Sequence, residues 1–274
     1  MTSISHRVEN STDPVVLRRL CVAAIAFGAF GQLFIPFVHG QSRTFVTILG
    51  IVALATAAGL HALSESAAAL YAALGLVAVG AVIEVIGAKT GLVFGDFAYT
   101  KTLGLHVLGI PAVLALTWLM IGWPAFVLGR LVGNAPVVGT AIMVGWSLLF
   151  DPQMVKAGFW EWKATSWPAI NGTPIISTLG RAVTAAMVMF ALERLVAIDV
   201  SFEGLCVVLL GWTWLWSVVS SLVFGLGGRG SGVVGGLALT AALAPVVLAV
   251  IDSQGVGAAD GADPRGAQQR RSEP

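Results

Sequence analysis

Charged residues are scarce in this chain of 274 residues. They make up 11% of it, whereas soluble domains carry about 25%. Apolar residues make up 57% and the mean hydropathy is +0.89, which is more apolar side chain than a soluble core of this length can enclose. The 15 basic and 14 acidic residues nearly cancel, so there is no electrostatic reason to expect binding of nucleic acid. The composition indicates a polytopic membrane protein.

Cysteine and histidine are also rare, and their positions exclude several kinds of site. Cys21 and Cys206 are the two cysteines, and both lie inside apolar runs. They match no ligand spacing, so we expect neither a disulfide framework nor a zinc site. The four histidines are never three or four residues apart, which argues against a clustered di-iron centre. No glycine-rich dinucleotide motif follows a strand-like segment. We therefore expect no metal and no redox cofactor.

Long apolar runs dominate the chain instead. A helix of about 20 apolar residues crosses the ~30 Å hydrocarbon layer of a membrane. The runs that qualify are Val15–Val38, Thr44–His61, Ser66–Ile86, Val107–Leu131, Val137–Phe150, Ile175–Leu195, Gly204–Phe224 and Val233–Ile251. The fifth is short, so the count is seven or eight. The runs lack the period-two alternation of a membrane barrel, and no segment is a convincing strand. The sequence predicts an all-α membrane bundle of seven or eight transmembrane helices.

The two ends of the chain are polar. Residues 1–14 have no apolar core, so we expect a polar tail and not a signal peptide. Residues 253–274 are rich in Gly, Ala, Asp, Arg and Gln, a composition typical of disorder. Residues 15–252 between them form one predicted transmembrane domain. Basic residues are more numerous on the side that holds both tails, which favours cytoplasmic termini.

Two connections between the predicted spans hold much of the polar and aromatic material outside the tails. They are Gly87–His106 and Asp151–Pro174. Two spans separate them, so the connections lie on the same membrane face whichever way the chain is inserted. We therefore expect these two motif loops, residues 87–106 and 151–174, to pack together and to build one site.

An acidic residue lies just before the first of these loops. Glu84 is inside an apolar run, about one turn from its end. At full depth an ionisable group costs roughly 2.5 kcal/mol or more, and it usually faces a cavity or a partner. Gly87, Gly91 and Gly95 follow at every fourth position, which fits either close helix packing or a broken backbone. The alternative is that this segment is purely structural. The Glu84 carboxylate would then reach the membrane interface, and the glycines would only allow close packing of helices.

The second loop begins with Asp151-Pro152, a pair typical of a helix stop. Trp160 and Trp162 follow, and an interfacial aromatic belt would explain either of them alone. Residues two apart point about 200° apart on a helix but to the same side of an extended segment. If both tryptophans line a site, the segment that carries them is predicted to be extended.

Together the two segments resemble a known family. The first reads Glu84-x-x-Gly-x-x-Thr90-Gly-x-x-Phe94-Gly-x-aromatic-x-Tyr99 with Trp118 further on, and the second reads Asp151-Pro152 with Gly158-x-Trp160-x-Trp162. This pattern, over about Ala67–Leu195, resembles the carotenoid biosynthesis membrane-protein family. That family includes carotenoid 1,2-hydratases and bisanhydrobacterioruberin hydratases. The chain departs from the family pattern at Ser177 and Arg181, where Asn and Trp are common.

The resemblance implies an integral protein of the bacterial cell membrane whose substrate is an acyclic carotenoid or a similar isoprenoid lipid. It also implies a hydratase without a cofactor, with other carotenoid-pathway enzymes as candidate partners. Hydration of a terminal double bond needs a strong proton donor, and desolvation keeps a carboxylic acid neutral. We therefore predict Glu84 as the acid, and Asp151 and Asp96 as groups that orient water or accept the second proton.

Aromatic faces can stabilise the resulting carbocation by about 0.5–2 kcal/mol each. The predicted substrate contacts are Phe94, Tyr99, Trp160, Trp162, Thr90 and Trp118. Two alternatives stay open at this point. One is a different reaction on the same class of lipid, such as isomerisation, and the other is a non-enzymatic lipid carrier or transporter.

Overall fold

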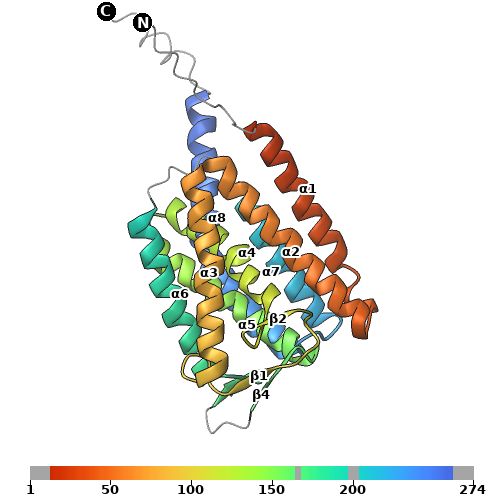
Figure 1. Ribbon diagram of the computed structural model, residues 1–274. Coiled ribbons are helices and arrows are strands. Elements are labelled where there is room, and N and C mark those ends of the chain that lie inside the picture. The colour runs from red at the N-terminus through yellow and green to blue at the C-terminus, as the bar shows by residue number, and fades with distance from the viewer. Residues whose placement is uncertain (1–12, 164–167, 197–203, 262–274) are drawn as a thin grey trace, which may run out of the picture.

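A computed structural model of the chain describes residues 13–163, 168–196 and 204–261. These residues form eight long helices, shown in Figure 1. They are α1 (Pro14–Gln32), α2 (Gly40–Glu65), α3 (Ala67–Thr90), α4 (Ala112–Leu131), α5 (Thr140–Lys156), α6 (Ile175–Leu195), α7 (Gly204–Leu222) and α8 (Arg229–Gly261). A short 3₁₀ turn, Ile35–Phe37, follows α1, and a π-helical turn, Ala135–Gly139, precedes α5. Each of the eight, with the 3₁₀ turn added to α1 and the π-helical turn added to α5, is long and apolar enough to cross a membrane, which confirms the all-α prediction.

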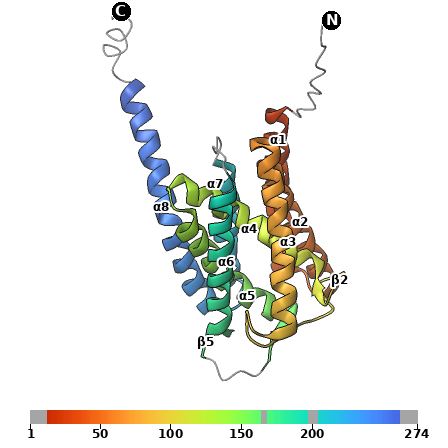
Figure 2. The ribbon, with the colours of Figure 1, turned by 60° about the vertical axis from the view of Figure 1, so that its left-hand side comes forward.

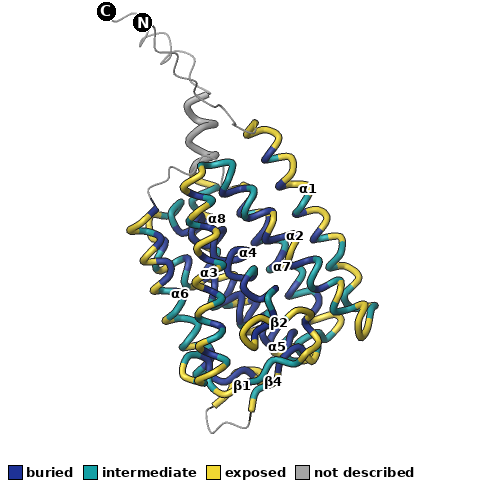
Figure 3. Tube along the Cα trace, viewed as in Figure 1, coloured by how far each residue is buried: buried dark blue, intermediate teal, exposed yellow. Residues whose placement is uncertain are grey.

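The core of the bundle lies around α4. This helix is apolar on all sides and almost entirely buried, as its dark colour in Figure 3 shows. The other helices surround it and turn large apolar side chains outward, for example Phe45, Tyr71 and Met187. A helix that is apolar all round belongs in such a core, while outward apolar faces suit contact with lipid. The chain is thus a multi-pass membrane protein.

Beside the motif loops, the predicted boundaries of the fourth and fifth helices differ from the structure. The fourth helix begins at Ala112 and not at Val107, because β2 (His106–Val107) and β3 (Ile110–Pro111) form a small hairpin there. Leu108 and Gly109 form the two-residue turn of this hairpin, with φ values of 54° and 93°. The commonest type of two-residue hairpin turn needs a positive φ at both positions.

The fifth helix does not stop at Asp151 but runs through Pro152 to Lys156. A proline inside a membrane helix is tolerated where a neighbouring helix covers the freed backbone. Here α8 packs against α5 at Leu148, four residues before the proline, where Gly235 has no side chain to keep the two backbones apart.

The C-terminal prediction also needs correction. α8 continues as a helix to Gly261, past the start of the predicted disordered tail at residue 253. Extending an existing helix is far easier than starting one, so polar residues can follow the membrane span in helical form. The rest of that tail, 262–274, and most of the predicted N-terminal tail, residues 1–12, lie outside the described residues.

Short strands, which the sequence did not reveal, join the two motif loops. β1 (Phe97–Tyr99) pairs antiparallel with β4 (Trp160–Trp162), so that Tyr99 lies opposite Trp160 and Phe97 opposite Trp162. A third pair, β5 (Ala169–Ile170) and β6 (Thr173–Pro174), lies just before α6. Strands of two or three residues are too short to show alternation. The pairing of β1 with β4 confirms that the two loops pack together on one face.

The β1–β4 pair lies at one end of the bundle, as Figure 1 shows. The first turn of α1 and the last turns of α8 lie at the opposite end, which Figure 2 also shows. This arrangement follows from an even number of crossings, since a chain that crosses eight times returns to the side from which it started.

Candidate functional site

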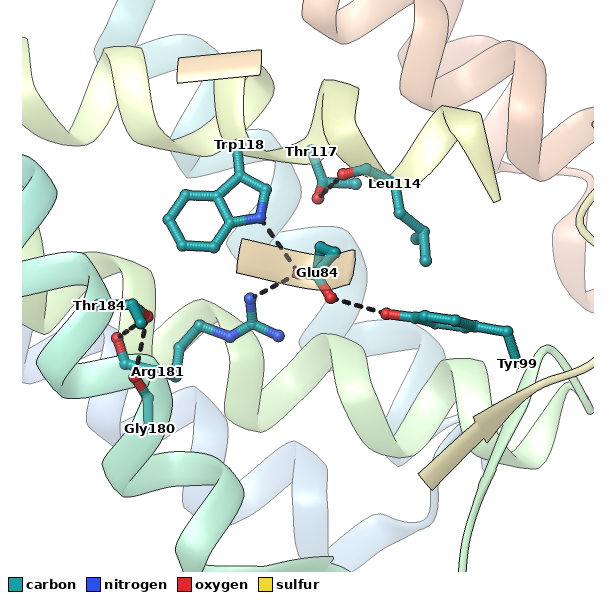
Figure 4. Close-up of polar contacts among 8 residues, drawn as sticks. All are labelled: Glu84, Tyr99, Leu114, Thr117, Trp118, Gly180, Arg181 and Thr184. Atoms are coloured by element: carbon teal, nitrogen blue, oxygen red, sulfur yellow. Dashed lines mark hydrogen bonds and ion pairs between the residues drawn. The ribbon is translucent and has the colours of Figure 1, made fainter. Parts of the chain in front are cut away.

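Glu84 is the centre of a buried hydrogen-bond network. Its side chain is on the inner face of α3, and the residue is only 4% exposed. Oε2 accepts a hydrogen bond of 2.7 Å from the Tyr99 hydroxyl. Oε1 accepts hydrogen bonds of 3.1 Å from Trp118 Nε1 and from Arg181 Nη1. Figure 4 shows these three donors converging from β1, α4 and α6 on one carboxylate.

Glycines allow two of these donors to approach. Gly80 lies one turn before Glu84 on α3, and a Cβ there would overlap the Trp118 ring. Gly180 on α6 lies against the backbone carbonyl of Val93, so that any side chain at this position would collide with that carbonyl. The absence of these two side chains brings α4 and the loop after α3 close enough for the network to form.

The same loop turns sharply because α3 ends at Thr90. Gly91 caps the helix in the left-handed conformation with φ +66°, and Gly95 turns the chain again with φ +79°. Gly87 makes room for the Phe94 ring, which folds back onto α3. The three glycines therefore serve a broken backbone and do not form a ladder along one helix face. This broken backbone directs β1 and Tyr99 towards Glu84.

The Tyr99 phenol is a donor in this network. Burial raises the pKa of Tyr99 well above its usual range, and the nearby Glu84 carboxylate raises it further. The hydroxyl therefore keeps its proton and donates to Glu84. Because the phenolate would lie beside a carboxylate, ionisation of Tyr99 is disfavoured twice.

Arg181 is the functional residue that sequence reasoning left unassigned. Its guanidinium forms an ion pair with Glu84 at 3.1 Å and stacks over the Phe94 ring, with Cζ 4.4 Å from the ring centroid. The signal was present, because Arg181 is a basic residue inside the run Ile175–Leu195, and a charge within a membrane span usually has a partner. Only the fold shows that this partner is Glu84.

Asp151 lies in the same site but is bonded differently. It is on α5 and only 4% exposed, and it interacts electrostatically with Arg181 and Glu84. Across the described part of the chain, no hydrogen bond to its side chain is found, although its oxygens are not among the fully buried atoms that lack a partner. The two carboxyls of the site thus have contrasting surroundings, since Glu84 has three donors and Asp151 has none.

A small cavity joins these groups. Its volume is about 30 Å³, and its polar lining comes from Glu84, Tyr99, Thr117, Asp151 and Arg181. The rest of the lining is Phe94, Phe97, Leu114, Trp146, Phe150, Trp160 and Trp162. The aromatic rings form a continuous shell. Trp146 stacks on Phe150 with centroids 4.2 Å apart, and edge-to-face or tilted contacts continue through Trp160 and the rings of β1.

Trp160 and Trp162 both line this cavity because β4 is extended, as predicted for two tryptophans that share a site. Glu161 between them points to the opposite side and is exposed. Two donors on the lining residues have no hydrogen-bond partner among the residues described, namely Trp162 Nε1 and Arg181 Nε. An apolar shell with unused donors and an unbonded carboxyl is suited to a small polar ligand.

Two of the predicted site residues lie elsewhere. Asp96 is exposed, and its carboxylate packs against Gly91 in the turn after α3. Thr90 is exposed at the end of α3, where its hydroxyl donates to the Ile86 carbonyl and accepts a hydrogen bond from Leu92 N. Both residues shape the loop, and neither lines the cavity. The structure brings together the other predicted residues: Glu84, Asp151, Phe94, Tyr99, Trp118, Trp160 and Trp162.

Within the described ranges, no group of three or more His, Cys, Asp or Glu side chains is placed to hold a metal ion. The carboxyl groups of Glu84 and Asp151, which line the cavity beside aromatic faces, offer acid–base chemistry.

Comparison with known proteins agrees with this picture. The model of a family described as carotenoid biosynthesis protein matches residues 42–250, which is more than half of the chain. No curated protein and no solved structure matches the chain. The matched residues include all of the cavity lining.

Proposed function

Because the chain belongs to the carotenoid biosynthesis protein family and so has a role in making these lipids, we propose that it is a hydratase. Its substrate is an acyclic carotenoid, and the reaction adds water across a terminal double bond. The observation that carries this proposal is the small cavity with Asp151, Arg181 and Trp162 in its wall.

The size and lining of this cavity suit one water molecule. A cavity of about 10–15 Å³ or more can hold a water, which needs two to four polar partners, and this cavity has a volume of about 30 Å³. The Asp151 carboxyl and the unused donors of Arg181 and Trp162 supply those partners. A hydratase needs a water held beside an acid in apolar surroundings. An isomerase must exclude water from that place, because a water there would add to the carbocation.

The geometry favours Asp151 over Glu84 as the proton donor. Sequence reasoning assigned this role to Glu84, but Glu84 is ion-paired with Arg181 and accepts two further hydrogen bonds. Protonating it would break that pair, and the protonated oxygen would no longer accept the hydrogen bonds that it receives. The guanidinium of Arg181 can balance the charge of only one carboxylate, which is that of Glu84. The free-energy cost of burying Asp151 is therefore lowest when Asp151 is the neutral acid. Glu84 then acts as a positioning residue that holds Arg181 and Tyr99.

The reaction itself is a balanced addition. The π electrons of the terminal double bond take the proton of Asp151, a C–H bond forms at the less substituted carbon, and a tertiary cation forms at the other carbon. The aromatic faces of Trp146, Phe150 and Trp160, which line the cavity, would stabilise this cation. The water oxygen then bonds to the cationic carbon, and its surplus proton returns to the Asp151 carboxylate. The net change is alkene plus water to tertiary alcohol.

Expression of the full chain in a host that makes lycopene tests the proposal. The expected product carries the mass of one added water for each reacted end, and growth in ¹⁸O-labelled water places the label in the new hydroxyl. A product of unchanged mass but altered absorption would mean isomerisation. Unchanged lycopene beside correctly inserted protein would argue for a carrier. Either result would overturn the hydratase assignment.

A further inference from the structure

A second cavity runs along the outside of the bundle between α3 and α6. It is a groove of about 670 Å³, and nearly all of its lining is apolar. On α3 the lining residues are Ala68, Tyr71, Ala72, Gly75, Leu76, Val79 and Ile83, and on α6 and just beyond it they are Thr184, Met187, Val188, Ala191, Leu192, Leu195 and Val196. Figure 2 shows the two helices side by side along the length of the bundle.

The groove is long, straight and open. Ala68 and Ile83 are fifteen residues apart on α3, which corresponds to about 22 Å at the helical rise of 1.5 Å per residue. Halfway along, Gly75 has no atom within 4 Å of where a Cβ would be. Small residues thus widen the middle of the groove. A compact ligand would fill only part of this space, whereas an extended hydrocarbon chain would follow it.

The lining offers nothing to a polar ligand. Thr184, the hydroxyl residue at one end, already hydrogen-bonds to the backbone carbonyls of Gly180 and Arg181. Tyr71 lies towards the other end of the groove, and it is exposed. Every other lining side chain is a hydrocarbon or a thioether. A ligand that fits this surface would therefore be apolar along its whole length.

The groove ends beside the polar site. Ile83 is the lining residue next to Glu84 on α3, and Thr184 is one turn beyond Arg181 on α6. A chain in the groove would have one end at the Glu84–Arg181 pair and would extend from there towards the opposite membrane face. The packing of α3 against α6 does not by itself require an apolar groove to end at an ion pair.

We propose that this groove binds the polyene chain of the carotenoid, parallel to α3 and α6, with the reacting end at the Glu84–Arg181 pair. This inference deepens the proposed function and rests on it for the identity of the reacting end. A polyene is stiff and already extended, so it loses little conformational freedom on binding. A flexible saturated acyl chain loses more, and we expect it to bind more weakly.

Induced circular dichroism of lycopene tests the groove without requiring any reaction. Lycopene has no stereogenic centre, so a signal in its visible band arises when the purified full chain holds it in a chiral setting. The variants Gly75→Trp and Met187→Trp fill the groove from opposite walls, and Leu74→Trp is the matched control. Leu74 is exposed on α3 and does not line the groove. We expect at least a tenfold loss of the signal in both groove variants and a wild-type signal in the control.

Two checks keep the result interpretable. Gly75 faces open space, so the larger side chain should not unfold α3, and thermal melting will show this for each variant. If Gly75→Trp cannot be purified, Met187→Trp decides the question from the other wall. Equal signals in groove and control variants, or no signal from the wild-type chain, would overturn the inference. So would displacement of lycopene by an equal amount of a saturated phospholipid.

The groove and the hydratase assignment fail in different ways. The variant Asp151→Asn should keep the full lycopene signal while it loses hydration. If the wild-type chain binds lycopene through the groove but adds no water, the groove stands and the hydratase proposal falls. If the chain hydrates lycopene while the groove variants react and bind like wild type, the groove falls and the hydratase proposal stands.

Discussion

Arg181 Nη1 lies 3.1 Å from Glu84 Oε1, although 97 residues separate the two in the chain. Both residues are in membrane-spanning helices, on α6 and α3. The pair ties together two helices that otherwise leave an apolar groove between them. The ion pair therefore lies at the polar end of that groove, and it leaves Asp151 as the carboxyl without a hydrogen-bond partner among the described residues.

Replacing Asp151 with Asn should abolish hydration while leaving the fold intact. The change is nearly isosteric, and no protein hydrogen bond to Asp151 among the described residues is lost. Loss of a positioned acid typically costs a factor of about 10²–10⁴ in rate. Product mass analysis gives the rate, and thermal melting of the purified variant provides the control. Hydration at the wild-type rate would remove Asp151 from the mechanism and return Glu84 to the role of acid.

Glu84→Gln should impair stability as well as hydration. The substitution leaves Arg181 buried without its counterion, and breaking a buried ion pair on one side costs about 3–5 kcal/mol. The double variant Glu84→Gln/Arg181→Gln removes both charges, so it should recover a large part of the lost stability. The free energy of unfolding in detergent measures both effects. A Glu84→Gln protein as stable as wild type would contradict an ion-paired Glu84.

Gly180→Ala should be strongly destabilising, because the added methyl group would collide with the Val93 carbonyl. Overpacking typically costs about 1–3 kcal/mol, and more where the obstacle is backbone. Gly211→Ala is the matched control, since a Cβ at Gly211 on α7 would meet no atom within 4 Å. Melting temperatures of the two variants make the comparison. Equal melting temperatures would mean that α6 and the loop after α3 are not packed as closely as described.

Trp162→Phe should slow hydration without lowering stability. The substitution keeps an aromatic face beside Phe97 but removes Nε1, which has no partner among the described groups. Losing one hydrogen bond to the water is worth about 1.4 kcal/mol, a factor of ten in rate. The ratio of hydrated to isomerised product should fall too. When water adds more slowly, the carbocation has more time to lose a proton from another neighbouring carbon, which gives an isomeric alkene. An unchanged rate and ratio would show that Trp162 does not position the water.

Much of this fold could be read from the sequence, and the failures have physical causes. Apolar runs located the eight membrane helices, since the thickness of the membrane fixes their length, although the short fifth run left the predicted count at seven or eight. The segment with Trp160 and Trp162 was predicted to be extended if both line the site, because residues two apart share a side only in an extended segment. The extension of α5 through Pro152 could not be foreseen, as it depends on how α8 covers that backbone.

The site was only partly predictable for a related reason. Glu84 and Asp151 stood out because carboxyls are rare beside membrane spans, but nothing in the sequence said which of them would meet Arg181. That depends on the way the helices pack. Asp96 was a candidate for orienting water or accepting the second proton, and the left-handed turn at Gly91 places it on the exposed side of the loop. Charge and composition therefore found the candidates, and tertiary packing separated them.

The position of β1 and β4 at the end of the bundle opposite to the start of α1 has a consequence for sidedness. A reporter fused to either terminus will report the compartment that the polar site does not face. With cytoplasmic termini, as the basic residues predict, the site lies at the outer leaflet. Hydration would then take place on one side of the membrane only. Each carotenoid would gain its hydroxyl group in the leaflet that faces away from the cytoplasm.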